Sequence, residues 1–249
     1  MRFPKIHEKP MSVARARRAV AINFFALGSA IGLWASRIPD LKQAHNLNEA
    51  QFGVLLLVMA FGAVISFPVA GFFVDRNGAA NVTKVLSIAT LFFVVSLAFA
   101  SPLWVMGVFV FVTGCCIGSL DVAMNGWGAE VEKAAGRPMM SSFHGIYSLG
   151  AGAGAAAGAA ALWSHMSLQG HFVLWGAVIA ILVVYAVCTK WLAQPAPQME
   201  TGAKSPVFVL PKGSLFFVGI MALVAALGEG AITDWAALYQ IQELGFEKS

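Results

Sequence analysis

Charged residues are scarce in this 249-residue chain, because Asp, Glu, Lys and Arg together make up only 11% of it. Soluble globular domains carry about 25% charged residues, so this composition excludes an ordinary soluble domain. Hydrophobic residues make up 59% of the chain, and the mean hydropathy is +0.76. Such a surplus of apolar residues is typical of a protein that lies within a lipid bilayer.

Cysteine is also rare, and the three that occur, Cys115, Cys116 and Cys188, lie inside apolar stretches. Their number and spacing exclude a disulfide framework and a zinc site, so we expect them to be small core residues. The chain also lacks a P-loop and a nucleophile–base pair with a supporting acid. We therefore expect no metal, no cofactor and no enzymatic activity.

Glycine is abundant between residues 150 and 158, where the pattern superficially resembles a phosphate-binding loop. No strand precedes this stretch and no Lys follows it, which argues against that function. Gly150, Gly154 and Gly158 recur every four residues, so they lie on one face of a helix. The spacing predicts a smooth stripe for close helix packing.

Seven apolar segments are long enough to cross a bilayer, which requires roughly 20 apolar residues each. They cover about residues 19–38, 50–74, 82–100, 103–129, 140–163, 170–190 and 214–240. Their connections are short, except for the stretch 191–213. The pattern predicts an all-α polytopic membrane protein whose two chain ends lie on opposite sides of the membrane.

Lys and Arg are distributed unequally between the two sides of these predicted helices. Thirteen fall on the side of the amino terminus, and only Arg37, Lys42 and Lys248 fall on the other side. The positive-inside rule then predicts a cytoplasmic amino terminus. The first apolar segment is too long for a signal-peptide core, so we expect an uncleaved first helix. The basic pI of about 9.1 therefore reflects membrane topology rather than binding to nucleic acid.

Two short internal repeats indicate how the segments are organised. The pattern Phe-x-x-Gly-x-x-Ile-Gly occurs at 25–32 and again at 111–118, three helices later, so these two units are inverted in the membrane. The pattern Ala-Ile-x-x-Trp-Ala occurs at 30–35 and at 231–236, six helices later, so this repeat runs parallel. Together they predict three-plus-three inverted units, with a second half that begins at the seventh segment.

This organisation predicts four parts of the chain. They are a basic cytoplasmic tail over 1–18, a six-helix bundle over 19–190, a cytoplasmic loop over 191–213, and the first helix of a second bundle over 214–249. A second half of comparable length would be needed to complete the repeat. We therefore expect a partial product that does not transport a solute on its own.

Asp121 is a carboxylate in the middle of the otherwise uncharged apolar segment 102–127. An ionised side chain at that depth costs about 2.5 to 3.5 kcal/mol on insertion scales, and it persists where it faces a polar cavity or a partner. Asn125 lies one helical turn further on, and Gly114 and Gly118 share the same helix face. A carboxylate beside an amide can carry a proton and hydrogen bond a hydroxylated solute. The alternative is a structural clamp, in which a neighbouring helix satisfies Asp121.

The connection after the second segment carries a motif that resembles a known family signature. Gly71-Phe-Phe-Val-Asp75-Arg76-Asn-Gly78 resembles the Gly-x-x-x-Asp-Arg-x-Gly signature of the major facilitator superfamily. Gly71 would let helices approach, Asp75 can cap a helix or accept from Arg, and Gly78 permits a tight turn. The resemblance implies a major-facilitator helix bundle in which this loop is a cytoplasmic gate. Residues 79–81 lack the paired basic residues that usually follow, which would weaken that gate.

Within the superfamily, the fourth and fifth segments resemble the fucose-permease-like branch of sugar/proton symporters. The similar stretches are Gly114-x-x-x-Gly118-x-x-Asp121-x-x-x-Asn125, where that branch typically has Glu at the acidic position, and residues 140–150. No Lys or Arg lies between Lys84 and Lys133, so the basic residue of many drug/proton antiporters is missing. The resemblance implies that Asp121 couples protons to the movement of a solute.

The fifth and first segments supply further candidates for solute binding. His144, Tyr147 and Ser148 share a helix face at i, i+3 and i+4, and the resemblance places this helix beside the central cavity. Either they contact the solute or His144 is satisfied by a backbone carbonyl. Asn23 either packs helices together or lines the cavity.

The first and seventh segments carry the remaining charged candidates. Glu229, flanked by glycines, lies near the middle of the seventh segment, and Asp234 lies nearer its outer end. Five residues separate them, which is about 140° around a helix, so they point in different directions. Glu229 is the candidate for solute binding and Asp234 for an outer gate. Arg37 and Asp40 are most simply a salt pair, with an outer-gate function as the alternative.

Trp34 and Trp235 occupy equivalent positions in the parallel repeat, near the outer ends of their helices. Either they stack on a sugar ring or they belong to the aromatic belt at the membrane interface. We include Trp34 among the candidates for solute binding.

The sequence thus predicts a carrier of a small polar organic solute, such as a sugar or a related metabolite. It would work by alternating access, be coupled to protons, and span a cell membrane of the bacterial inner-membrane type. An uncoupled facilitator or exporter is one alternative, and a non-transporting sensor or scaffold on a carrier fold is the other. The expected partners are the lipid bilayer, the solute and protons, with no nucleic acid.

Overall fold

The computed structural model describes residues 13–191 and 213–245, which form helices joined by short connections. Seven helices in these ranges are long and apolar enough to cross a membrane, which confirms the predicted all-α polytopic class. The helices are α1 (Val13–Ser36), α2 (Ile38–Ala44), α3 (Glu49–Asn77), α4 (Ala79–Ser96), α5 (Leu103–Ala135), α6 (Met140–Trp163), α7 (Leu168–Val187) and α8 (Ser214–Gln242).

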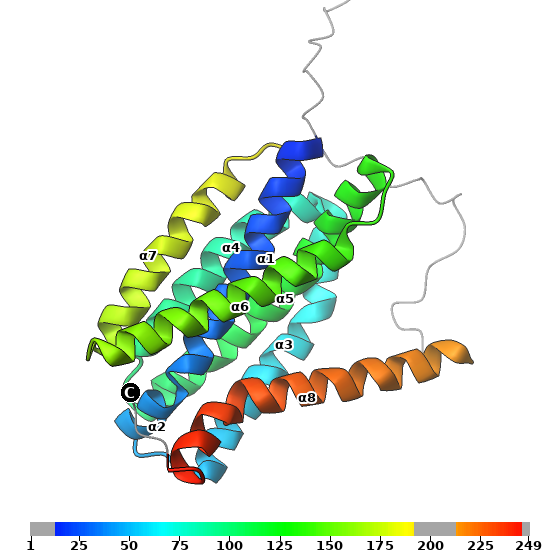
Figure 1. The fold of residues 1–249 in the computed structure, drawn as a ribbon. Coiled ribbons are helices and arrows are strands. Elements are labelled where there is room, and N and C mark those ends of the chain that lie inside the picture. The colour runs from blue at the N-terminus through cyan, green and yellow to red at the C-terminus, as the bar shows by residue number, and fades with distance from the viewer. Residues whose placement is uncertain (1–12, 192–212, 246–249) are drawn as a thin grey trace, which may run out of the picture. The chain divides into compact units, whose positions relative to one another are not determined.

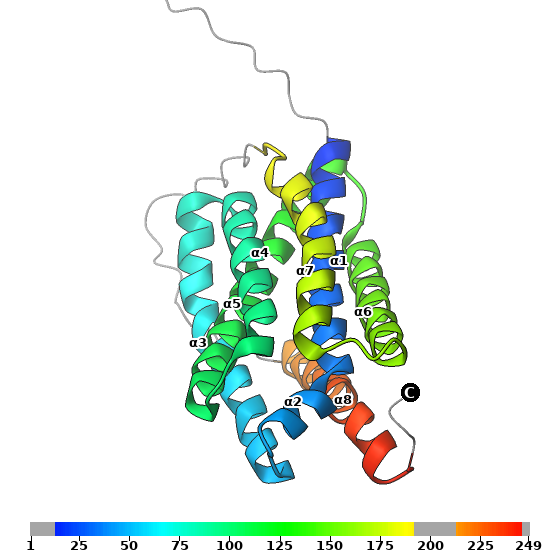
Figure 2. The ribbon, with the colours of Figure 1, turned by 90° about the vertical axis from the view of Figure 1, so that its left-hand side faces the viewer.

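The chain forms two units, Met1–Ala193 and Gln194–Ser249. In the first unit, α1 and α3 to α7 pack side by side as one bundle, and the short α2 follows α1 (Figures 1 and 2). The helix α8 belongs to the second unit. Most of the predicted tail 1–18 and of the predicted loop 191–213 lies outside the described residues.

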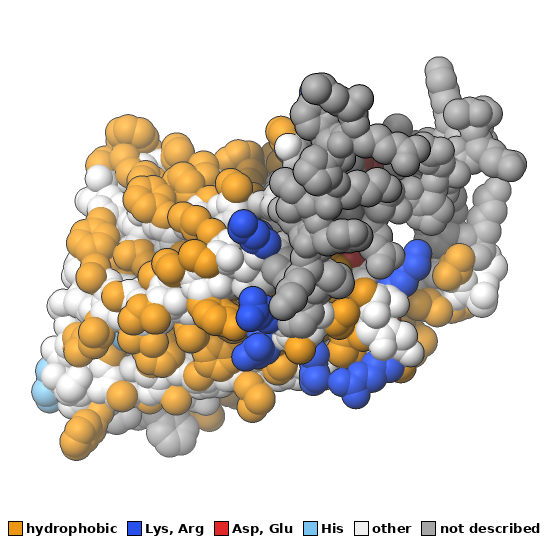
Figure 3. Space-filling view, turned by 90° about the horizontal axis from the view of Figure 1, so that it is seen from above, with side chains coloured by type: hydrophobic (Ala, Val, Ile, Leu, Met, Phe, Trp, Pro, Cys, Tyr) orange, Lys and Arg blue, Asp and Glu red, His pale blue; other side chains and the backbone are white. Residues whose placement is uncertain are grey.

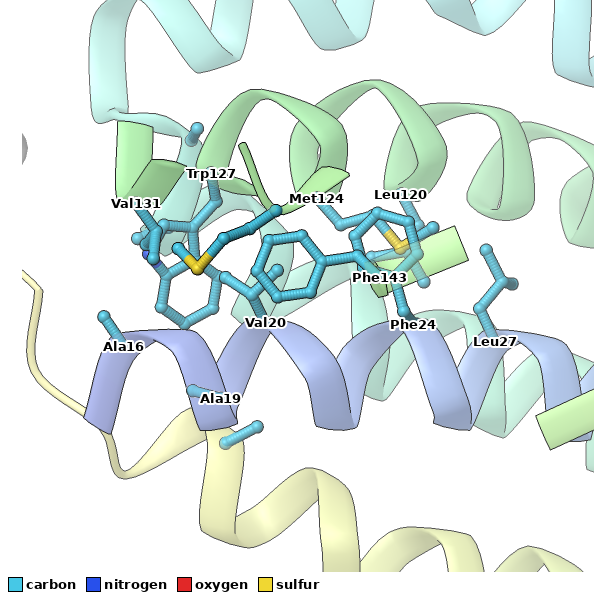
Figure 4. Packing of buried hydrophobic residues seen from close by; sticks show 14 residues of the cluster. Ala16, Ala19, Val20, Phe24, Leu27, Leu120, Met124, Trp127, Val131 and Phe143 are labelled. Carbon is cyan, nitrogen blue, oxygen red and sulfur yellow. The ribbon is translucent and has the colours of Figure 1, made fainter. Parts of the chain in front are cut away.

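The centre of the bundle is an apolar cluster between α1, α5 and α6. In Figure 4 the α1 side chains Val20 and Phe24 face Met124 and Trp127 of α5, and Phe143 of α6 lies between the two helices. All five are fully buried or nearly so. Burying an aromatic or large aliphatic side chain stabilises a fold by about 1.5 to 3 kcal/mol, although helices already within lipid gain mainly from close packing. This cluster fixes α5 and α6 relative to α1.

Glycines allow two pairs of helices to approach with their backbones in contact. A Cβ atom added at Gly28 or Gly32 of α1 would collide with backbone atoms of α6. In the same way, a Cβ atom at Gly114 or Gly118 of α5 would collide with backbone atoms of α3. These are the glycines of the repeat at 25–32 and 111–118. The atoms they approach are also spaced by four residues, in Tyr147 and Ala151 of α6 and in Met59 and Ala63 of α3.

The partner helices return equivalent contacts. Gly150 of α6 lies against the backbone of Phe25, and Gly62 of α3 lies against the backbone of Phe111. Phe25 and Phe111 are the first residues of the two repeat units. The α1–α6 and α3–α5 pairs are therefore built alike, which is what an inverted repeat of three helices predicts. The stripe Gly150, Gly154, Gly158 packs on α1, as the spacing indicated.

The ends of the helices show where local sequence sets their bounds. Asn48 begins α3 with a capping box, because its side chain accepts a hydrogen bond from the N–H of Gln51, whose side chain accepts one from the N–H of Asn48. The Glu132 carboxylate accepts hydrogen bonds from the N–H groups of Met139 and Met140 at the start of α6. The helix α5 therefore continues past the predicted limit at residue 129.

Two small features differ from what the sequence indicated. Cys188 is exposed at the end of α7 rather than a core residue, whereas Cys116 is buried and Cys115 is half-buried. The short helix α2 was not predicted, and it begins directly after Arg37 with Pro39 in its first turn. Proline is favoured there because the first N–H groups of a helix have no partner within it.

Most of the basic residues lie at one end of the bundle. Arg37 and Lys42 lie at the opposite end, near the close of α1 and on α2, and all other described Lys and Arg lie where α1, α4 and α6 begin or where α3, α5 and α7 end. Figure 3 shows Lys and Arg side chains gathered on the described part of this end. We call it the basic end.

Candidate functional site

The helix α5 carries Asp121 on a face that the bundle leaves open. Asp121 is exposed, although its neighbours Leu120, Ala123 and Met124 are buried. One turn of helix later, Asn125 is half-buried on the same face. The structure therefore places this predicted pair together, away from the apolar cluster behind it.

Asn125 holds one side of the Asp121 carboxylate. Its Nδ2 donates to Oδ1 of Asp121 at 3.0 Å and to the backbone carbonyl of Asp121 at 2.9 Å. Within the described residues, the bond to Oδ1 is the hydrogen bond of the Asp121 carboxylate, and its second oxygen accepts none. A single amide thus orients the carboxylate and leaves acceptor capacity for a proton or a hydroxyl group.

His144 of α6 extends this polar face. Its imidazole lies close enough to Asp121 for an electrostatic interaction between the two side chains. The ring of Phe24 lies beneath it, edge to face, with ring centroids 5.2 Å apart. Phe24 also stacks on Phe143 at 5.5 Å, so an aromatic layer from α1 and α6 supports the imidazole. A proton acceptor and a titratable imidazole therefore face the same side of the bundle.

The three predicted residues of α6 do not all share this face. Ser148 is exposed beside His144, and its hydroxyl donates to the His144 carbonyl at 3.2 Å. Tyr147 instead is half-buried and packs against the apolar cluster, because the close approach of Gly28 turns this side of α6 toward α1. We call Asp121, Asn125, His144 and Ser148 the polar face.

Asn23 lies inside the bundle rather than on the polar face. Its Nδ2 donates to the Ala19 carbonyl at 2.7 Å, and its Oδ1 accepts from the Ser87 hydroxyl of α4. The cavity beside it has a volume of about 10 Å³, which is enough for about one water molecule and too small for an organic solute. The structure favours helix packing for Asn23, of the two alternatives that the sequence left open.

The end of α1 opposite the basic end is also closed. Trp34 is only 5% exposed, so it is neither an interfacial belt residue nor open to a ligand in this conformation. Arg37 forms the predicted ion pair with Asp40, with 2.6 Å between Nε and Oδ2. Arg37 is buried and donates from Nη2 to the Met166 carbonyl at 3.1 Å, which ties α1 to the connection between α6 and α7. The pair therefore fixes this end of the bundle.

The motif from Gly71 to Gly78 forms the junction between α3 and α4 at the basic end. Gly78 has φ +83° and ψ 141°, a conformation that is essentially restricted to glycine, and its N–H donates to the Val74 carbonyl at 2.8 Å. Asp75 and Arg76 are exposed on the last turn of α3. A Cβ atom at Gly71 would meet nothing within 4 Å in the described residues, so the expected close helix approach at Gly71 is absent there.

This contrast yields a stability prediction. Gly78→Ala should lower the free energy of unfolding by about 1 to 3 kcal/mol, because alanine is strained at this positive φ. Gly71→Ala should leave it unchanged or raise it by up to about 1 kcal/mol, because alanine favours a helix interior and has free space here. Thermal unfolding in detergent measures both. Equal destabilisation by the two variants would contradict the assignment of the turn to Gly78.

The helix α8 carries the candidates of the seventh segment. Glu229 is exposed, whereas Asp234 and Trp235 are half-buried near the carboxyl end of the helix. Their positions on α8 agree with different directions for Glu229 and Asp234. In the described residues no group of three His, Cys, Asp or Glu side chains could hold a metal ion.

The fold and these residues agree with a comparison of the sequence with known families. The sequence model of the Major Facilitator Superfamily matches residues 19–249. The chain belongs to the Major Facilitator Superfamily. It is a multi-pass membrane protein, and its helices α1 and α3 to α7 are those of a major facilitator bundle.

Three bacterial relatives are similar to this chain over most of its length. An uncharacterized transporter of Sinorhizobium fredii, y4wD, is 39% identical over 93% of this chain and 61% of its own length. An uncharacterized MFS-type transporter of Yersinia pestis is 30% identical over 94% of this chain and 60% of its own length. The membrane protein MosC of Rhizobium meliloti is 30% identical over 90% and 54%. The chain thus spans 54% to 61% of the length of these relatives.

Sequence reasoning missed several residues of this major facilitator chain that shape its site and its basic end. They include the Phe24 ring beneath His144, the Ser87 partner of Asn23, and the Trp191 indole, which donates to Glu130 at 2.8 Å. Each contact joins different helices or segments, so no local spacing signals it.

Proposed function

We propose that this chain supplies one helix bundle of a carrier that moves a small polar organic solute, such as a sugar or a related metabolite, across the membrane. The observation that carries the proposal is the polar face: a carboxylate held by a single amide, with an imidazole nearby, on an otherwise apolar bundle. The stretch 114–125 favours the fucose-permease-like branch of the family.

The proposed chemistry assigns a task to each residue of the polar face. Asp121 takes up and releases the coupling proton, since it is the only acidic side chain in the middle of α5. Asn125 and His144 hydrogen bond hydroxyl groups of the solute, and the Ser148 hydroxyl, which donates to the His144 carbonyl, adds an acceptor. Protonation of Asp121 alters what it can offer to the solute, from acceptor only to donor and acceptor. Binding of the proton and the solute is thereby linked.

Alternating access requires that the polar face be exposed to one side at a time. We propose that Glu229 of α8 also contributes to solute binding. The glycine-packed pairs α1–α6 and α3–α5 move as rigid bodies, because their backbones are in direct contact. The motif at 71–78 is the proposed gate on the basic end, and Arg37, Asp40 and Asp234 belong to the outer gate.

The basic end is proposed to face the cytoplasm. Among the described residues, the Lys and Arg side chains concentrate there, and positively charged segments are retained on the cytoplasmic side of bacterial membranes. This orientation places the amino terminus in the cytoplasm and the Arg37–Asp40 pair on the outer side.

Uptake into sealed vesicles that contain the carrier, with this chain as one of its helix bundles, tests the function. With a panel of sugars and small metabolites, symport predicts accumulation of one solute above its outside concentration only when a pH gradient is imposed. Equilibration without accumulation would indicate an uncoupled facilitator. Saturable binding without flux would indicate a sensor and would overturn the proposal.

A further inference from the structure

The helices α6 and α7 leave part of α1 uncovered near the basic end. They lie close at their connection, between Trp163 and Leu168, and diverge toward the end at which α1 begins (Figure 1). Between them Ala21, Ile22 and Phe25 of α1 remain half-buried instead of buried. The divergence thus opens the side of the bundle along α1.

This opening is an apolar groove with a volume of about 580 Å³. Its floor is Ala21, Ile22 and Phe25 of α1, and its walls are Ile146 of α6 and Leu182 of α7. These five side chains provide the apolar lining that a hydrocarbon chain requires. Among the described residues that line the groove, only Arg18 and Tyr185 could hydrogen bond a polar solute.

A second cavity of about 610 Å³ lies at the basic end of this groove. Arg18 and Tyr185 line both cavities, so the two adjoin. The other described residues that line the second cavity are Arg15 of α1 and, after the end of α7, Cys188, Thr189 and Lys190. Three cations from two segments of the chain therefore converge on one space, together with two hydroxyl groups.

The described residues that line this second cavity do not compensate its positive charges, because none of them is acidic. Glu130, which does not line the cavity, accepts a hydrogen bond at Oε2 from the indole of Trp191 at 2.8 Å. Arg18 donates from Nε to the Ala14 carbonyl at 3.4 Å, a contact within its own helix that leaves its terminal N–H groups to face the cavity. The arrangement is complementary to an anion.

We propose that the two cavities together form a binding site for an anionic phospholipid. Arg15, Arg18 and Lys190 hold the headgroup phosphate, with the hydroxyl group of Tyr185 as an additional donor. An acyl chain lies in the groove over Ile22 and Phe25. Basic pockets between membrane helices on the cytoplasmic side are suited to anionic headgroups, and the adjoining groove selects a lipid over a free phosphate.

Membrane topology alone does not account for this arrangement. The positive-inside rule is satisfied by any Lys or Arg at the basic end, including Arg17, Lys133 and Arg137, which line neither cavity. Among the described Lys and Arg residues, only Arg15, Arg18 and Lys190 converge where an apolar groove begins. This difference supplies a matched control for the experiment.

Native mass spectrometry of the detergent-solubilised protein tests the proposal. Binding of dioleoyl phosphatidylglycerol should exceed that of dioleoyl phosphatidylcholine. Arg18→Gln and Lys190→Gln should each weaken phosphatidylglycerol binding about fivefold, because a cation near the surface contributes about that factor. Arg137→Gln, the control, should leave it unchanged. Leu182→Gln, which makes the groove polar, should weaken binding of both lipids.

Three results would overturn the proposal. The first is equal binding of the two lipids, and the second is a loss in Arg137→Gln as large as in Arg18→Gln. The third is displacement of the lipid by an equal concentration of inorganic phosphate, which would show an anion site with no preference for lipid. Thermal unfolding checks that each variant is folded. Lys190 is exposed beyond the end of α7, so Lys190→Gln tests the proposal without altering helix packing.

Discussion

Asp121→Asn is expected to abolish solute-driven proton movement by the carrier to which this chain contributes one bundle, while solute binding survives. Asparagine has nearly the shape of aspartate and can still accept from Asn125, so the helix face keeps its structure. It cannot take up or release a proton, so the coupling is lost. With one proton per solute, a gradient of about one pH unit sustains about tenfold accumulation, whereas the variant should only equilibrate the solute. Alkalinisation of the medium around vesicles, with the solute added, measures the difference.

Two variants separate the loss of the proton site from the loss of a negative charge on α5. Asp121→Glu keeps the acid and should retain coupling, although the longer side chain changes the position of the carboxylate. Glu132→Gln removes another carboxylate of α5, one that caps α6 and lies off the polar face, and it should transport normally. If Asp121→Asn moves protons and solute like the unaltered protein, Asp121 is a structural clamp and the proposed coupling is wrong.

The number and approximate bounds of the long helices could be predicted from the sequence because crossing a bilayer imposes a minimum length of apolar residues. The short helix α2 could not, because seven residues that include Pro39, Asp40 and Lys42 carry no hydrophobic period. The end of α5 was placed too early for a related reason. Its last turns are polar, and they are extended by the Glu132 cap, a contact with the next helix.

The candidate site could be predicted where its residues share one helix. Asp121 and Asn125 are one turn apart, and helix geometry alone brings them together. The same reasoning failed for Tyr147, because the contact of its backbone with Gly28 of another helix decides which side of α6 faces inward. It also left Asn23 ambiguous, because its partner Ser87 is 64 residues away. Contacts between helices decide such positions.

The spacing of the glycines predicted which helix faces pack closely but not which helices they pack against. Their four-residue spacing predicted that one face of α6 packs closely, and the repeat at 25–32 and 111–118 predicted equivalent contacts. The pattern did not identify the partner of each stripe. The structure shows that α1 packs on α6 and that α5 packs on α3. The repeated motif therefore lies on α1 in the first pair and on α5 in the second.

Gly154→Leu is expected to prevent assembly of the bundle. A Cβ atom at Gly154 would already collide with the Ser29 carbonyl and would press on the backbone of Leu33. A backbone cannot rotate away as a flexible side chain can, so α1 and α6 would have to separate. Even Gly154→Ala should therefore cost about 3 kcal/mol, at the upper end of the range for overpacking. The yield of folded protein after solubilisation and its thermal unfolding measure both variants.

Gly152 is the matched control, since it lies on the same helix two residues away and a Cβ atom there would meet nothing within 4 Å in the described residues. Gly152→Ala should be neutral or stabilising by up to about 1 kcal/mol, because alanine favours the helix. If Gly154→Ala destabilises the protein and Gly152→Ala does not, the loss of stability at Gly154 comes from its contact with α1. Equal tolerance at both positions would mean that α1 and α6 do not pack backbone to backbone. The rigid pair on which the proposed alternating access depends would then not exist.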